Sequence, residues 1–96
     1  MDESVRGTGR TIRQMLDAPK GAVFVSCHSG SMDYDRRLAR KHGREDLRIV
    51  SPEWLTGDRW RGLSISGIVV DHATKLTDRQ IECLVILFTR VRKEQS

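Results

Sequence analysis

The residues from Gly7 to Thr11 have types suited to binding phosphate and magnesium. They read Gly-Thr-Gly-Arg-Thr. Glycine lets backbone N–H groups approach phosphate oxygens, a cation neutralises phosphate charge, and a hydroxyl group can bind Mg²⁺. The pattern G-x-x-x-x-G-K-[ST] joins these features, and Gly9 and Thr11 match it. Ser4 replaces its first glycine, and Arg10 replaces its lysine. We predict a loop that binds phosphate through four residues: Gly7, Gly9, Arg10 and Thr11.

A carboxylate suited to holding magnesium follows an apolar segment later in the chain. The run Ile68–Val70 consists of β-forming residues, and Asp71 comes directly after it. A rigid strand can hold such a carboxylate in place, and Mg²⁺ is commonly bound by one or two carboxylates and the phosphates of a nucleotide. Glycine-containing loops and strands that end in Asp are each common. Together, in this order, they predict that Thr11 and Asp71 hold Mg²⁺ with ATP or another nucleotide.

An alternating series of helices and strands has to position these groups. Apolar runs of β-forming residues predict strands over residues 22–27, 47–51 and 67–71. Helical spacing, caps and breakers predict helices over residues 10–17, 31–42, 52–57 and 77–92, the last with a capping box of Thr77 and Gln80. Residues 1–9 are polar and contain glycine, and they read as a loop. The alternation predicts an α/β fold with flanking helices and a small, mainly parallel three-stranded sheet, a Rossmann-like arrangement with strand 22–27 at its centre.

Length and composition predict a single domain. The chain has 96 residues, of which 38% are hydrophobic and 31% charged, as in a folded domain rather than a disordered chain. We expect residues 1–6 and 93–96 to be flexible. No apolar run approaches the roughly 20 residues of a membrane span, and the first residues lack the order of a secretory signal. We therefore expect a cytoplasmic protein that makes no membrane contact.

The basic residues and the last predicted helix are the two candidate partner surfaces. The formal net charge is +4, a mild excess that permits binding to nucleic acid or to an acidic protein without demanding it. Aromatic residues make up 5% of the chain, which is too few for a base-stacking surface. A basic cluster on the predicted helix 31–42 is the candidate contact: Arg36, Arg37, Arg40 and Lys41. The broad apolar face over residues 81–91 fits either the core or a homodimer interface.

The order of these segments resembles the first half of a helicase-type P-loop NTPase domain, and also short phage or prophage proteins that begin with a Gly-Arg-Thr loop. GTGRT resembles the first motif of such a domain, and AVFVSCHSGSMDYDRRLAR the strand and helix that follow. LRIVSPEWL resembles a later strand and turn, and GIVVDHA resembles the Asp-Glu box. The resemblance covers residues 4–74. It implies a truncated P-loop NTPase-like architecture that binds a nucleotide, located in the host cytoplasm if the protein is phage-encoded.

Departures from that pattern argue against efficient hydrolysis. Arg10 stands in place of the lysine, and arginine lacks the compact charge of lysine. His72 stands in place of the glutamate that would polarise the attacking water. Only three residues precede Ser4, where such domains have a strand, so a second copy or a partner would complete the sheet. We expect weak binding of a nucleotide or phosphate, or binding without hydrolysis.

Two other interpretations stay open. In the first, the fold is a relic, and the protein is a non-enzymatic binding or inhibitory module. It would act on a host or phage protein or on nucleic acid, through its basic surface or its C-terminal helix. In the second, YDRRLARKHGREDLRIVSPEWL resembles the second half of a BRCT domain, with Trp54 as its buried tryptophan. That resemblance implies binding to phosphopeptides or DNA ends.

Overall fold

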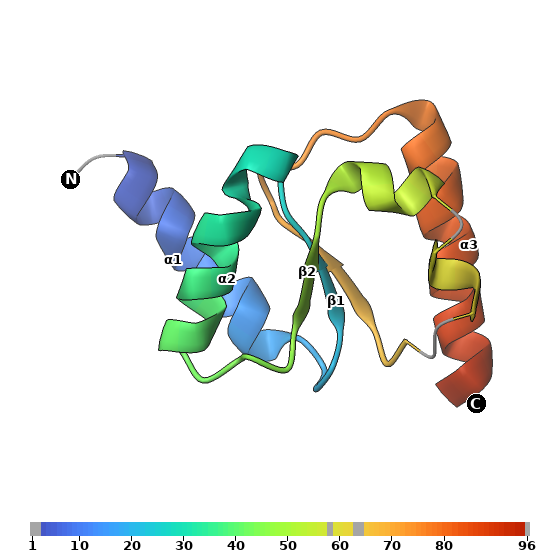
Figure 1. Ribbon diagram of the computed structural model, residues 1–96, viewed down its shortest axis with the longest axis horizontal. Coiled ribbons are helices and arrows are strands. Elements are labelled where there is room, and N and C mark those ends of the chain that lie inside the picture. Colours follow the sequence, from blue (N-terminus) through green and yellow to red (C-terminus); the bar gives the residue numbers. More distant parts are fainter. Residues whose placement is uncertain (1–2, 58, 63–64, 96) are drawn as a thin grey trace.

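Three short parallel strands form the centre of the molecule in the computed structural model, which describes residues 3–57, 59–62 and 65–95 (Figure 1). The strands are β1 (Val23–Val25), β2 (Arg48–Val50) and β3 (Ile68–Val70). The α-helices are α1 (Glu3–Asp17), α2 (Met32–Lys41) and α3 (Asp78–Gln95). Single turns of 3₁₀-helix connect them: η1 (Ser29–Ser31), η2 (Pro52–Thr56) and η3 (Arg59–Gly62).

The sheet has the strand order β2–β1–β3, and both pairings are parallel. Val23 of β1 lies opposite Arg48 on one side and Ile68 on the other. The predictions of an α/β fold, of a small three-stranded parallel sheet and of a central strand within residues 22–27 are therefore confirmed. Because all strands run the same way, their carboxyl ends meet at one end of the sheet, where ligands of open parallel sheets usually bind.

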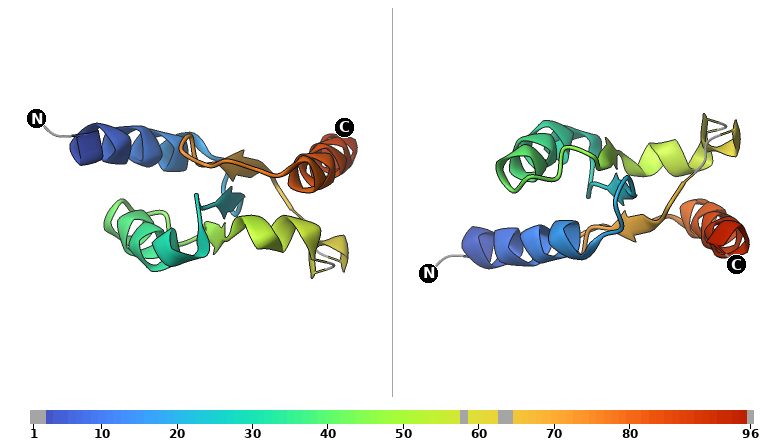
Figure 2. Two further views of the ribbon diagram at one scale, coloured as in Figure 1. Left: turned by 90° about the horizontal axis from the view of Figure 1, so that it is seen from above. Right: turned by 90° about the horizontal axis from the view of Figure 1, so that it is seen from below.

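The sheet separates two helical layers, which Figure 2 shows end-on. Helices α1 and α2 cover one face, and α3 covers the other together with η2 and η3. The first layer encloses a core cluster of buried residues: Met15, Ala18, Ala22, Phe24, Leu38, Ala39, Leu47 and Ile49. The second encloses another: Val23, Val25, Val50, Leu55, Trp60, Ile65, Ile68, Leu87 and Val91. Burial on both faces explains why the strands are apolar throughout instead of alternating.

Helix α1 begins much earlier than the sequence predicts. It includes residues 3–9, so the loop expected over residues 1–9 is wrong wherever the structure describes that segment. Glycine and polar residues favour a loop only as a weak local preference, which tertiary packing can override. The inner side of the helix is anchored by Thr11 and Met15, and Ala18 follows directly after its end; all three are buried. The helical hydrogen-bond ladder then continues towards the N-terminus through Gly9 and Gly7.

Helix α3 begins at the predicted capping box. The Thr77 backbone N–H donates to Gln80 Oε1 at 2.9 Å, and the Gln80 N–H donates to Thr77 Oγ1 at 3.2 Å. The predicted apolar face is only partly correct, because the helix contacts the core through Leu87 and Val91. Four large apolar side chains predicted on the broad face are exposed: Ile81, Val85, Ile86 and Phe88. The helix continues through Gln95, and the flexibility of residues 1–6 and 93–96 stays a prediction.

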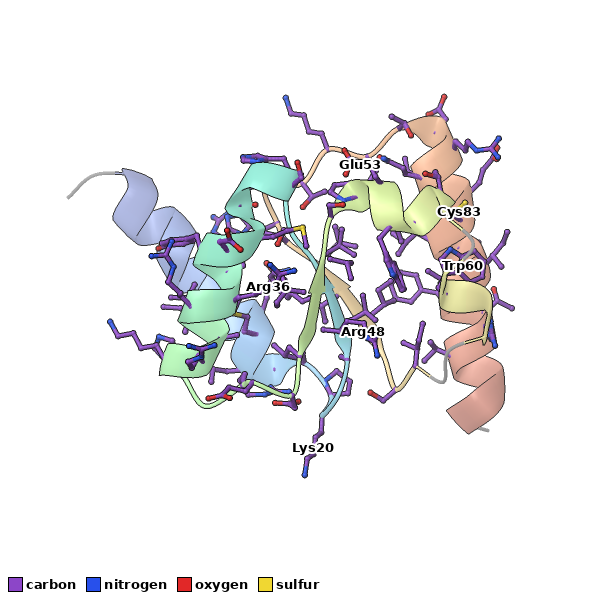
Figure 3. All side chains as sticks on the ribbon, in the orientation of Figure 1. Lys20, Arg36, Arg48, Glu53, Trp60 and Cys83 are labelled. Carbon is purple, nitrogen blue, oxygen red and sulfur yellow. The ribbon has the colours of Figure 1, made fainter. Side chains whose placement is uncertain are left out.

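Trp60 is the tryptophan at the centre of the second core cluster. Figure 3 shows it between the sheet and α3, and its Nε1–H donates to the Leu55 carbonyl at 2.9 Å. The indole ring is therefore both buried and hydrogen-bonded, as a buried tryptophan requires. Trp54, which the BRCT-like interpretation expects in the core, is only half-buried against the same cluster.

Arg44 ties the end of α1 to the connection between α2 and β2. Its guanidinium group donates to the carbonyls of Met15, Leu16 and Pro19, and it forms an ion pair with Asp46 at 3.0 Å. Helix α1 has no basic residue in its own last turn, so this distant arginine supplies the cation that a helix C-terminus favours. The hydrogen bond from Arg44 holds the pKa of Asp46 below its ordinary value, helped by the backbone N–H of Gly21.

The helical position of Gly9 leads to a stability prediction. Gly9→Ala should raise the free energy of unfolding by about 0.5–1 kcal/mol, since alanine loses less conformational freedom in a helix. A methyl group there would meet no atom within 4 Å. Gly43 is the matched comparison, because it is equally open but has a φ of 72°. Gly43→Ala should therefore lower stability by about 1 kcal/mol. Chemical denaturation measures both, and a loss of stability in Gly9→Ala would contradict a helix at this position.

The tie made by Arg44 leads to a second prediction. Arg44→Lys keeps the positive charge but cannot reproduce the several directed N–H bonds of the guanidinium group. It should lower the free energy of unfolding by on the order of 2 kcal/mol. Arg37→Lys, an exposed position on α2, is the control and should leave stability unchanged. Equal stability of the two variants in urea titrations would show that Arg44 does not hold α1.

Candidate functional site

Buried polar side chains converge at the carboxyl ends of β1 and β3. Ser26 and Asp71 directly follow these strands, Thr11 comes from α1, and Asp35 comes from α2. Each is less than 9% exposed. Buried polar groups need hydrogen-bond partners, and these four residues satisfy one another in two pairs. The sequence pattern places Ser26 and Asp71 at this end, whereas the helices supply their partners.

Thr11 and Asp71 form the first pair, and they are the two residues predicted to hold magnesium. Thr11 Oγ1 donates to Asp71 Oδ1 at 3.1 Å, across 60 positions of sequence. The same carboxylate oxygen lies 3.0 Å from His72 Nδ1. The structure therefore brings together the hydroxyl, the carboxylate and the histidine that sequence reasoning singled out in separate segments.

Gln14 joins this group, although no sequence signal indicates it. Its Nε2 donates to the Val70 carbonyl at 2.8 Å, and its Oε1 accepts the backbone N–H of His72 at 2.9 Å. These are the backbone groups on either side of Asp71 that face away from β1. The Gln14 amide therefore pairs with the edge of the sheet as a neighbouring strand would, and it fixes α1 beside the end of β3.

Asp35 and Ser26 form the second pair. Ser26 Oγ donates to Asp35 Oδ2 at 2.6 Å. Burial raises the pKa of Asp35; the nearby charge of Asp71 acts in the same direction, and the bond from Ser26 opposes both. The sequence indicates Asp35 only weakly, as an acid near the start of the inner face that continues through Leu38 and Ala39.

A pocket of about 460 Å³ lies between α1 and the end of β3. Its volume is in the range of small-molecule sites. The pocket is lined by Arg10, Arg13, Gln14, Asp17, Ala18, Pro19, Val69 and His72. Arg10 and His72 are the immediate sequence neighbours of Thr11 and Asp71. Two arginines, a histidine, an amide and the carboxylate of Asp17 thus surround one space, whose lining includes neither Thr11 nor Asp71 themselves.

The predicted phosphate-binding residues are only partly assembled as expected. Gly7 and Gly9 lie inside α1, beyond the first four residues whose N–H groups are free in a helix. Their backbone N–H groups belong to the helical ladder, so they cannot form the cradle that a phosphate loop needs. The loop geometry predicted for these two glycines is therefore wrong. Arg10 lines the pocket, and Thr11 contacts Asp71.

The oxygens of Thr11 and Asp71 fit two positions of a magnesium shell. Neighbouring ligand oxygens at about 2.1 Å from Mg²⁺ lie roughly 3 Å apart in an octahedron, and the two protein oxygens are 3.1 Å apart. Within residues 3–57, 59–62 and 65–95, no group of three or more His, Cys, Asp or Glu side chains could hold a metal ion. The remaining positions would thus be filled by water and phosphate oxygens, as is usual for Mg²⁺.

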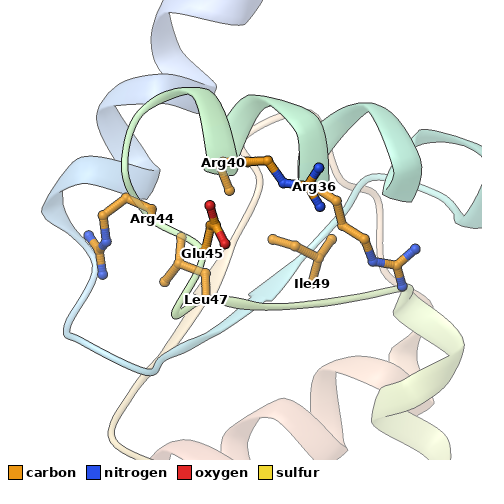
Figure 4. A pocket seen from close by; sticks show the side chains of 7 residues that line it. Arg36, Arg40, Arg44, Glu45, Leu47 and Ile49 are labelled. Atoms are coloured by element: carbon orange, nitrogen blue, oxygen red, sulfur yellow. The ribbon is translucent and has the colours of Figure 1, made fainter.

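The predicted basic cluster on α2 divides into two parts. All four of its side chains are exposed: Arg36, Arg37, Arg40 and Lys41. Arg36 and Arg40 line a second pocket, beside β2 (Figure 4). Arg37 and Lys41 do not line it. Arg36 also forms an exposed ion pair with Asp33 at 3.0 Å.

Comparison of the chain with protein-family models, with curated proteins and with solved structures gave no match. The described helices include none that combines the length and the apolar character needed to cross a membrane. The candidate site is therefore defined by its own geometry: two buried polar pairs at the carboxyl end of the sheet and a cationic pocket beside one of them.

The raised pKa of Asp35 leads to a pH prediction. Below the ordinary pKa of about 4, both the folded and the unfolded protein carry a neutral Asp35. As the pH rises through the raised pKa of the folded state, a buried charge forms and stability is lost. Asp35→Asn should therefore gain stability relative to wild type as the pH rises from about 4 towards neutrality.

Chemical denaturation at a series of pH values measures this difference. Ser26→Ala is the companion variant, because removing the Ser26 donor should move the loss of stability to higher pH. Groups that titrate without interacting with Asp35, including Asp46, are common to the compared proteins and cancel in the difference. A difference between Asp35→Asn and wild type that does not vary with pH would contradict the prediction.

Proposed function

We propose that the protein binds the phosphate groups of a nucleotide, together with Mg²⁺, in the pocket between α1 and β3, and that it does not hydrolyse the nucleotide. The observation that carries the proposal is the hydrogen bond between Thr11 and Asp71, whose sequence neighbours Arg10 and His72 both line the pocket. These three residues are the hydroxyl, the carboxylate and the cation that magnesium–phosphate binding requires.

The charges and size of the pocket support a phosphate-bearing ligand. Arg10 and Arg13 line it, against the single carboxylate of Asp17. Arginine binds phosphate through charge-assisted hydrogen bonds that can be bidentate. The apolar surface of Ala18, Pro19 and Val69 offers a place for a base or another apolar group. A pocket of about 460 Å³ is large enough for a small organic phosphate.

The residue types at the site support binding without turnover. His72 stands where the resemblance expects a glutamate that polarises the attacking water, and Arg10 stands in place of the lysine. His72 Nδ1 lies 3.0 Å from Asp71 Oδ1, and the His72 backbone N–H is bonded to Gln14. On this proposal the protein is a degenerate relative of P-loop NTPase domains, with Arg10, Thr11 and Asp71 as the residues that keep their roles.

The proposal predicts Mg²⁺-dependent binding of ATP that depends on Arg10. Titration calorimetry with MgATP should detect binding to the wild-type protein, and chelation of Mg²⁺ should weaken it. Arg10→Gln should weaken binding by about tenfold or more, because it removes a charged hydrogen-bond donor. Arg37→Gln is the matched control, since Arg37 is exposed on α2 and does not line the pocket.

Two outcomes would overturn the proposal. One is the absence of any thermal stabilisation by millimolar MgATP, because ligand at 100 times its Kd should add about 2.7 kcal/mol. The other is an equal loss of affinity in Arg10→Gln and Arg37→Gln, which would show that the binding depends on general surface charge and not on the pocket. Release of inorganic phosphate during incubation with MgATP would contradict the absence of hydrolysis while leaving the binding site in place.

A further inference from the structure

Strand β2 is an open edge of the sheet. The Arg48 N–H donates to the Ala22 carbonyl at 2.9 Å, and the Val50 carbonyl accepts the Ser26 N–H at 2.8 Å. These bonds turn the backbone of Arg48 and Val50 towards β1. Because backbone groups alternate along a strand, the N–H and C=O of Ile49 face away from the sheet. They are available to pair with another strand.

The second pocket lies directly beside this edge. It has a volume of about 190 Å³ and lies between α2 and β2. Its apolar floor consists of Ala39, Leu47 and Ile49. Figure 4 shows the Arg40 side chain reaching from α2 towards Ile49 and the Arg36 side chain extending past Ile49 along β2. The pocket therefore combines a place for an apolar side chain with two cations.

The cations next to the edge lie on both faces of the sheet. Arg36 and Arg40 are on the α2 face, whereas Arg48 alternates with Ile49 and is exposed towards the opposite face (Figure 3). Glu45 is the one carboxylate that lines the pocket. Arg44 also lines it, but its guanidinium group is engaged by Asp46 and by carbonyls at the end of α1. Arg36 also forms the exposed ion pair with Asp33. Three arginines beside the edge against Asp33 and Glu45 still leave a positive net charge there.

We propose that the β2 edge binds an acidic peptide segment, which adds to the sheet as a fourth strand. The backbone of the segment would pair with Ile49, an apolar side chain would enter the pocket, and carboxylates would meet Arg36 and Arg40. Strand addition is a general mode of peptide recognition in which the backbone supplies affinity and pockets supply specificity. A nucleic acid could use the arginines but could not match the strand-like pairing of the Ile49 N–H and C=O.

The two edges of the sheet differ in a way that supports this choice. At β3, the Gln14 amide already pairs with Val70 and His72, where an added strand would bind. At β2, no side chain within residues 3–57, 59–62 and 65–95 forms a hydrogen bond to the Ile49 backbone. The site is also distinct from the pocket between α1 and β3, so the inference does not depend on the proposed nucleotide binding.

A blocked heptapeptide with the sequence Thr-Glu-Thr-Val-Thr-Glu-Thr is the probe that tests the proposal. It is longer than the three residues of β2, and as a strand it presents the valine and both glutamates on one face, where the pocket and the arginines of α2 lie. Fluorescence anisotropy should detect binding that weakens with salt. Arg40→Glu should weaken it by about tenfold or more, and so should Arg36→Glu. The amide of Ile49 should gain protection from hydrogen exchange in the complex.

Matched controls distinguish binding at this site from attraction by general surface charge. Arg37→Glu changes the same charge on the same helix outside the pocket, and its affinity should stay within about threefold of wild type. The same heptapeptide with lysine in place of both glutamates should not bind. Circular dichroism and thermal unfolding check that each variant is folded. The proposal is overturned if the glutamate peptide does not bind to wild type, or if Arg37→Glu and Arg40→Glu lose affinity equally. It is also overturned if a thymidine oligonucleotide binds through Arg40 while the Ile49 amide is unprotected in every complex.

Discussion

Parallel pairing of the three strands is the constraint on which the other features of this protein depend. It requires that the chain return to the same end of the sheet after each strand, and it buries both faces under helices. The residues that follow β1 and β3, Ser26 and Asp71, are consequently brought to one end and removed from water. The two helices of one layer then have to supply polar partners there, and they do so with Thr11 and Asp35.

Helix α1 is held at both ends of the sheet by polar contacts. At the carboxyl end, Thr11 and Gln14 bond to Asp71, Val70 and His72. At the opposite end, Arg44 bonds to the last carbonyls of the helix. These contacts decide which side of α1 faces β3. The exposed arginine next to Thr11 consequently lies over the pocket beside His72, which is the basis for assigning a phosphate ligand to that pocket.

The two edges of the sheet have different chemistry because the helices beside them cover different parts of the edge strands. The Gln14 amide covers the end of β3, so the space beside it is a pocket for a small ligand. Helix α2 instead leaves the middle of β2 open and brings Arg36 and Arg40 next to it. We propose a small phosphate-bearing ligand for the first edge and an extended acidic chain for the second.

The sequence by itself determined the helices and strands that depend on the pattern of neighbouring residues. Three apolar runs of β-forming residues predicted the strands, and their alternation with helices predicted parallel pairing with the first strand in the middle. Thr77 and Gln80 predicted the start of α3, because a capping box involves only neighbouring residues. The sequence also assigned Thr11 and Asp71 to one magnesium site, which stays a prediction, but it did not predict the hydrogen bond between them. The predictions of nucleotide binding, of a dimer through α3 and of phage origin stay predictions.

Only the tertiary structure decided the features that depend on distant contacts. Gly7 and Gly9 favour a loop locally, yet burial of Met15 and Ala18 sustains a helix through both glycines. The side of α3 that faces the core follows from where the helix crosses η2, not from the width of its apolar stripe. Gln14 and Arg44 gain their roles from backbone groups far away in the sequence. The chemistry of a side chain shows which hydrogen bonds it can form, but the fold decides which partners come within reach.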